Sequence, residues 1–276
     1  MYYGYTDEEL SVAYDNRATF GAWQATIEKG VALSKPVRAR AEALLRTTYG
    51  ATPRSVANVY PAPTPGSPVL VFIHGGYWRS LEMEMLDFVL APYLDRGVAG
   101  INLEYDLAPA VSLSGIVTQI NAAVRWVASN AAAWNGDPSR IVVAGHSAGG
   151  HLAVMTGLEK SPAVRHVVSV GGVYDLEPVR RSVINQDLRM SEDEACAQSP
   201  IHRANGQSVP FSLFCGEGEL PEFRRQQRAF AAALDSRGMA FSAAELPGHD
   251  HFSAVFDLAT PGAAPFETLM ASLQRD

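Results

Sequence analysis

The feature that most constrains the fold is one short turn, Gly145-His-Ser-Ala-Gly149. It follows an apolar, mostly β-branched run (141–144), typical of a buried strand, and precedes residues 150–155, which have helical character. So sharp a turn requires glycine on both sides, because a Cβ there has no room. The pattern predicts a nucleophile elbow that presents the Ser147 hydroxyl at the carboxyl edge of a sheet. The Ala148 amide, at the helix N-terminus, is then expected to stabilise an oxyanion.

Other apolar runs alternate with helical stretches along the chain. Strands are predicted at 55–60, 69–73, 97–103, 165–170, 209–215 and 239–246, and helices at 7–14, 36–46, 113–134, 221–237 and 266–274. This alternation predicts an α/β fold with a mostly parallel, doubly wound sheet and the chemistry at the carboxyl ends of its strands. The aromatic-rich segment 1–50 is expected to be a helical cap over the active site, and docking of its aromatic residues onto the core is an equally good interpretation. The polar segment 179–207 is expected to be an irregular insertion near the mouth of the site.

Composition bounds the class of protein. With 276 residues, 47% of them hydrophobic, the chain can bury a large core as a single domain. The net charge of −7 argues against nucleic acid or an anionic membrane as a partner. The two cysteines form no ligand cluster and fit a reducing compartment, and the acidic N-terminus is unlike a signal peptide. We expect a cytoplasmic protein without metal or other cofactor; a homodimer stays open.

A nucleophilic serine needs a base, and the base needs an orienting acid. Enzymes with such an elbow place these groups later in the chain, first the acid and then the histidine. The loop after the last predicted strand offers His249 and His251, and the apolar residues after His251 favour that one. The loop after the 209–215 strand offers three glutamates and no aspartate, and the residues alone leave the choice open: Glu217, Glu219 and Glu222.

A second glycine turn follows the predicted strand 69–73. Gly75 and Gly76 come directly after His74, and paired glycines allow bare backbone amides to approach a tetrahedral intermediate. Gly75, Gly76 and Ala148 are therefore the predicted oxyanion donors. The residues predicted to contact substrate are Tyr77, Trp78, His146 and Tyr174. For Tyr77 and Trp78, packing in the core is an equally good interpretation.

Together these motifs resemble the α/β-hydrolase fold, and within it kynurenine formamidase (arylformamidase), near the hormone-sensitive-lipase-like esterases. The resemblance extends over nearly the whole chain. It rests on His74-Gly-Gly-Tyr-Trp78, Tyr105-Asp-Leu-Ala-Pro109, Gly145-His-Ser-Ala-Gly-Gly150, Tyr174-Asp-Leu-Glu-Pro178 with Asn185, Leu188, Glu194-Ala195 and Ser199-Pro200 after it, Gly216-Glu-Gly-Glu-Leu-Pro-Glu-Phe223, and His251-Phe252. It implies His251 as the base and Glu219 as the acid, where most family members carry aspartate.

The predicted activity is a metal-independent serine hydrolase with Ser147, His251 and Glu219 as its triad. The resemblance implies release of formate from an N-formyl aryl amide such as N-formylkynurenine, in tryptophan catabolism. Small esters are the alternative substrate, because esterases of this fold use the same machinery. A non-catalytic binding protein is disfavoured, because neither the nucleophile nor the histidine is missing.

Overall fold

One eight-stranded sheet runs through the chain. The computed structural model describes residues 2–21, 23–159, 163–204 and 209–275. Its strands lie in the order β1-β2-β4-β3-β5-β6-β7-β8. Their bounds are β1 (Leu44–Thr48), β2 (Val56–Tyr60), β3 (Ser67–Ile73), β4 (Ala99–Leu103), β5 (Gly136–His146), β6 (Val164–Val170), β7 (Phe211–Gly216) and β8 (Phe241–Leu246). β2 pairs antiparallel with β1 and β4, and the other pairs are parallel. This topology confirms the predicted α/β-hydrolase fold.

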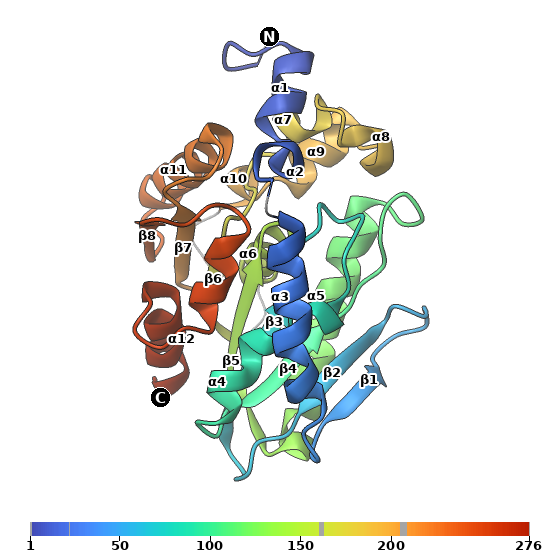
Figure 1. Cartoon of the computed structure of the whole chain (residues 1–276), viewed down its shortest axis with the longest axis vertical. Helices are drawn as coiled ribbons and strands as arrows, with labels where there is room; N and C mark the ends of the chain where they lie inside the picture. The colour runs from blue at the N-terminus through green and yellow to red at the C-terminus, as the bar shows by residue number, and fades with distance from the viewer. Residues whose placement is uncertain (1, 22, 160–162, 205–208, 276) are drawn as a thin grey trace.

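Helices cover both faces of the sheet (Figure 1), so its central strands alternate between two cores. Val69, Val71 and Ile73 of β3 face one core, with residues of α5, α6 and α11, while Leu70 and Phe72 face the other, with residues of α3, α4 and α12. The long helices are α3 (Trp23–Arg38), α5 (Leu113–Asn130), α6 (Ala148–Leu158), α11 (Pro221–Asp235) and α12 (Ala264–Gln274); α4 (Ala91–Leu94) is a single turn.

The register of the central strands places two loops together. β3 pairs with β5 so that Ile73 lies opposite Gly145. The chain leaving β3 at His74 therefore emerges beside the elbow at Ser147. Because parallel strands end at the same edge, the loops after β3, β5, β6, β7 and β8 all gather there.

The N-terminal segment agrees with the prediction in its first helix and differs from it farther along. Residues 7–14 are helical as expected, in α1 (Asp7–Ala13), followed by α2 (Asn16–Thr19). The predicted helix at 36–46 is wrong: α3 ends at Arg38, and Leu44–Thr48 forms the edge strand β1. Pairing with β2, irregular between Leu44 and Thr47, overrides the helical propensity of these residues.

The segment 179–207 is more ordered than predicted. Its described part holds short helices, the end of α7 (Glu177–Arg180), α8 (Asn185–Leu188), α9 (Glu192–Gln198) and α10 (Pro200–Arg203); residues 205–207 lie outside the described residues. Ile184, Leu188 and Ala195 are buried in the core of the α5 face. Arg181 pairs with Asp7 of α1 at 2.8 Å. The segment thus packs beside the N-terminal helices, and none of its described residues lines the cavity at Ser147.

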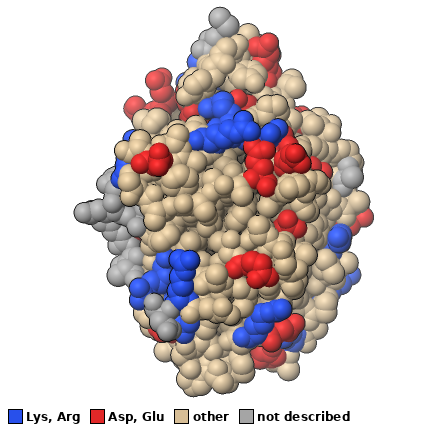
Figure 2. All heavy atoms as spheres, turned by 90° about the vertical axis from the view of Figure 1, so that its left-hand side faces the viewer, with Lys and Arg blue, Asp and Glu red and all other residues tan. Residues whose placement is uncertain are grey.

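Charges of both signs lie next to each other on the face formed by the last strand and the last long helices (Figure 2). Arg224 and Arg228 of α11 pair with Glu245 of β8 at 2.8 and 2.6 Å. Within the described residues, no helix is both long and apolar enough to span a membrane.

Candidate active site

Ser147 occupies the turn between β5 and α6. Its backbone has φ 57° and ψ −122°, a strained conformation for a residue with a side chain. A Cβ on Gly145 would overlap the Gly149 carbonyl, and a Cβ on Gly149 would overlap the Ile73 carbonyl oxygen of β3. The two glycines are therefore required by close backbone contacts, as the sequence predicts.

Ser147, His251 and Glu219 form a continuous series of hydrogen bonds. The Ser147 hydroxyl lies 2.9 Å from His251 Nε2, and His251 Nδ1 lies 3.0 Å from Glu219 Oε2. All three residues are at most 4% exposed. They come from three separate loops, after β5, β8 and β7, which meet at the carboxyl edge of the sheet.

The structure separates these residues from the other sequence candidates. His249 is half-buried and pairs with Asp257 at 3.3 Å. Glu217 is exposed. Glu222 is buried but accepts hydrogen bonds from Arg225 of its own helix. Of the candidate groups, only His251 contacts Ser147, and only Glu219 contacts His251.

Space for the histidine and its acid depends on residues that sequence reasoning missed. Gly171, after β6, has φ 58°, and a Cβ on it would lie 2.8 Å from Glu219 Oε1 and 3.2 Å from His251 Nδ1. The Phe223 ring packs at 4.7 Å from the His251 ring. A glycine directly after a buried strand is the signal that could have identified Gly171.

The loop after β3 brings backbone amides to Ser147. A Cβ on Gly75 would lie 2.9 Å from the His146 carbonyl oxygen and 3.0 Å from the Ser147 Cβ, so this loop packs directly on the elbow. Gly76 has φ 111° and lines the cavity. Ala148 begins α6, where the first N–H groups have no helical acceptor. This arrangement suits Gly75, Gly76 and Ala148 as oxyanion donors, which stays a prediction.

A buried network holds the Gly75 carbonyl. It accepts hydrogen bonds from His74 Nδ1 at 2.8 Å and from the Tyr105 hydroxyl at 3.3 Å. The His74 and Tyr105 rings stack at 4.3 Å. The carbonyl of one residue and the N–H of the next point in opposite directions across a trans peptide. The network therefore directs the Gly76 N–H away from itself.

Glu104 is the acidic member of this buried network. Its carboxylate accepts hydrogen bonds from His74 Nε2 at 2.9 Å, from Arg54 at 2.6 Å, and from the amides of Met83 and Tyr105 at 3.0 Å each. Burial acts to raise the pKa of Glu104, but the hydrogen bond and charge of His74 outweigh it and lower that pKa to about 2.

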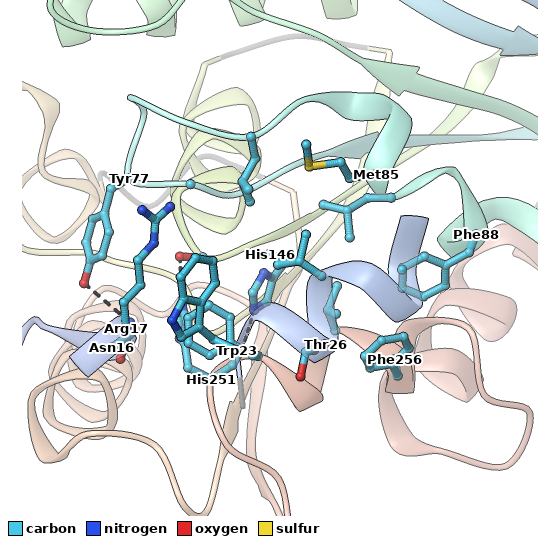
Figure 3. A pocket seen from close by; sticks show the side chains of 18 residues that line it. Asn16, Arg17, Trp23, Thr26, Tyr77, Met85, Phe88, His146, His251 and Phe256 are labelled. Carbon is cyan, nitrogen blue, oxygen red and sulfur yellow. Dashed lines mark hydrogen bonds between the residues drawn. The ribbon is translucent and has the colours of Figure 1, made fainter. Parts of the chain in front are cut away.

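An apolar cavity opens beside Ser147 (Figure 3), with about 690 Å³ of empty volume including its opening to solvent. One wall is α3, through Trp23, Ile27 and Gly30. Met85, Phe88, Val255 and Phe256 are among the residues that line the rest. A cap formed by this segment is predicted from the sequence, but helix α3 is not. The available signal for this wall was Gly30, a glycine inside the helix. A Cβ added to it would lie 3.3 Å from the Phe88 ring.

Two of the four predicted substrate contacts line this cavity, Tyr77 and His146. Trp78 and Tyr174 do not, and their prediction is wrong. Trp78 is fully buried, and its indole N–H donates to His151. Tyr174 is 1% exposed and bonded to Ser169. Both residues satisfy their polar atoms within the core, which is the packing role open to any large aromatic residue.

Three buried histidines make stability depend on pH. Burial lowers the pKa of His146 to about 3, with the His251 charge adding to the effect, and lowers the pKa of His151 and His166 to about 4. In the unfolded chain each takes up a proton near pH 6.5. The unfolded state therefore binds more protons as the pH falls from 6.5 toward 4. The free energy of unfolding therefore falls with pH in this range, by at most about 1.4 kcal/mol per pH unit for each histidine.

His166→Gln is expected to flatten this dependence, because it removes one of the three groups. Urea unfolding between pH 7.5 and 5 measures the slope, with the exposed His202→Gln as control. Identical slopes in the two variants would contradict the assignment.

The comparisons with known proteins agree with this geometry. The BD-FAE family model matches residues 59–221, more than half of the chain. The chain belongs to the BD-FAE family. Its relatives include a kynurenine formamidase of Danio rerio, 28% identical over 80% of this chain and 78% of the relative. They also include esterase LipQ of Mycobacterium tuberculosis, 28% identical over 72% of this chain and 52% of the relative.

A solved structure from Silicibacter, with only a provisional thioesterase name, superposes with a TM-score of 0.86 at 28% identity. It covers 97% of this chain, and this chain covers all of it. This member of the BD-FAE family is thus an α/β-hydrolase enzyme of the formamidase or esterase type.

Proposed function

We propose that this enzyme is a serine hydrolase that cleaves small acyl amides or esters through an acyl-enzyme. Ser147 is the nucleophile, His251 the general base and acid, and Glu219 the residue that orients the imidazole. The observation that carries the proposal is the hydrogen-bonded series at 2.9 and 3.0 Å, located at a strained strand-to-helix turn.

The reaction proceeds in two halves. Ser147 Oγ attacks the acyl carbon while its proton passes to His251 Nε2, and the amides of Gly75, Gly76 and Ala148 bind the oxyanion. The tetrahedral intermediate expels the amine or alcohol, which takes the proton from His251. Water then attacks the acyl-enzyme, gives a proton to His251, and releases the acid as the proton returns to Ser147.

Glutamate can serve in place of aspartate because its loop holds the longer side chain. Glu219 Oε1 is 3.3 Å from the Gly216 amide, which donates to it, while Oε2 faces the imidazole. Gly171 leaves the space that the carboxylate occupies. The buried carboxylate also favours the imidazolium that forms as His251 takes the serine proton.

The proposed substrate is an aryl formamide of the N-formylkynurenine type, which would yield formate and an aromatic amine. Two observations support it: the fish relative is a kynurenine formamidase, and aromatic side chains line the cavity. Trp23, Tyr77 and Phe252 provide surfaces for a flat ring. The second candidate, a carboxylesterase for small esters, is favoured by the apolar far end of the cavity and by LipQ.

A substrate comparison on purified enzyme tests the proposal. We expect formate release from N-formylkynurenine with a kcat/KM at least equal to that for p-nitrophenyl acetate and butyrate. Efficient ester cleavage without detectable formate release would assign the enzyme to the carboxylesterases instead.

A further inference from the structure

Arg17 is distinct among the residues around the cavity. Of the described residues that line it, Arg17 alone carries a permanent charge, and none is an aspartate or glutamate. Figure 3 shows Arg17 with Asn16 and Tyr77 at one end of the cavity and Phe88 with Phe256 at the other. The cavity therefore has a cationic end and an apolar end.

Two contacts hold the Arg17 side chain at this end. Its guanidinium carbon lies 4.8 Å from the centre of the Trp23 ring, and Nη2 donates to the Ser80 hydroxyl at 3.0 Å. A guanidinium carries five N–H donors, so four remain for other acceptors. Stacking on an aromatic face leaves these donors free along the edge of the group.

No carboxylate neutralises Arg17 within the described residues. Asp15, two residues earlier, instead accepts a hydrogen bond from the Ala18 amide and caps α2. No acidic side chain in the described part of the chain lies within 4.0 Å of the Arg17 guanidinium nitrogens. An unpaired, partly immobilised guanidinium at the edge of an apolar cavity is suited to bind a carboxylate.

We propose that Arg17 binds an anionic group of the substrate, and that the substrate class is aryl formamides or esters with a carboxylate distant from the scissile bond. The inference rests on the proposed function, since the acyl carbonyl must lie at Ser147. The aromatic body then lies against Trp23 and Phe252, which both line the cavity. Arg17 thereby selects such substrates over neutral esters of the same size.

The test replaces Arg17 by glutamine and varies the charge of the substrate. N-formylkynurenine is compared with its carboxamide, which lacks only the carboxylate charge. For Arg17→Gln we expect KM for N-formylkynurenine to rise about fivefold to tenfold. The kcat is expected to stay within about twofold, since a contact to the substrate carboxylate is made equally in the ground state and in the transition state. The change in KM for the carboxamide is expected to be several times smaller.

Lys29→Gln is the matched control. Lys29 lies on α3, is exposed, and places its ammonium 4.3 Å from the centre of the Phe256 ring, but it does not line the cavity. The Lys29→Gln variant should leave KM unchanged for both N-formylkynurenine and its carboxamide. Equal changes for the two substrates in Arg17→Gln, or no change for either, would overturn the role of Arg17.

Failure of the formamidase proposal would look different. In that case the wild-type enzyme releases no formate from either compound but still cleaves esters. The Arg17 comparison is then made with aryl acetates whose para chain ends in a carboxylate or a carboxamide. A selective rise in KM for the carboxylate upholds Arg17 as the anion-binding residue in an esterase, and its absence rejects it.

Discussion

Ser147→Ala is expected to lower kcat by at least about a thousandfold, because the reaction loses its nucleophile and the covalent route. Ser147 is 3% exposed and bonded to His251 Nε2 at 2.9 Å, so no other described side chain is poised to replace it. Alanine fits at the same backbone position, and the fold should survive. Single-turnover and steady-state kinetics with one formamide and one ester measure the loss.

Ser272→Ala is the control for this variant. Ser272 is similarly buried, and its hydroxyl donates only to the Thr268 carbonyl in α12. It should retain wild-type kcat. Activity of Ser147→Ala within tenfold of wild type, in protein with an unchanged unfolding midpoint, would remove Ser147 from the mechanism.

Glu104→Gln is expected to give the second largest effect, with kcat lowered about a hundredfold and KM little changed. The carboxylate binds His74 and Arg54, and His74 in turn holds the Gly75 carbonyl. Glutamine cannot accept all these hydrogen bonds, because one end of its side chain carries N–H donors. The Gly76 amide would lose its fixed direction, and oxyanion stabilisation would weaken while substrate binding persists.

The same variant should lower the free energy of unfolding by about 3 kcal/mol. It removes the negative charge of a buried ion pair and leaves the positive partner without compensation. Glu42→Gln is the control, since Glu42 pairs with Arg40 at 3.0 Å while 47% exposed. It should change neither kcat nor stability measurably. A loss of stability in Glu104→Gln with normal kcat would show that the network serves folding alone.

The geometry of the proposed triad was largely predictable because its sequence signals are local. Gly145 and Gly149 mark a turn whose backbone contacts exclude any Cβ, and chain order then limits the base and the acid to two short loops. The choice of Glu219 over Glu217 and Glu222 could not be made from composition or spacing. It depends on which carboxylate the loop after β7 turns inward, and there the family resemblance supplied the information.

The incorrect predictions concern residues whose type suits two different roles, so that only tertiary contacts decide between them. Leu44–Thr48 has residues suited to a helix but pairs with β2 as an edge strand. Trp78 and Tyr174 could equally line a pocket or pack in the core, and both pack in the core, where each forms a hydrogen bond with a buried side chain. The cavity wall on α3 depends on how that helix docks over Met85 and Phe88, and Gly30 inside the helix is a weak local signal for that contact.

Covalent labelling with a p-nitrophenyl phosphonate tests the central claim most directly. Tryptic cleavage after Arg140 and Lys160 gives a peptide, residues 141–160, in which Ser147 is the only serine. We predict one phosphonyl group per chain, located on this peptide at Ser147, together with loss of activity and no label on Ser147→Ala. Full labelling of Ser147→Ala, or inactivation with the label on another peptide, would contradict the account.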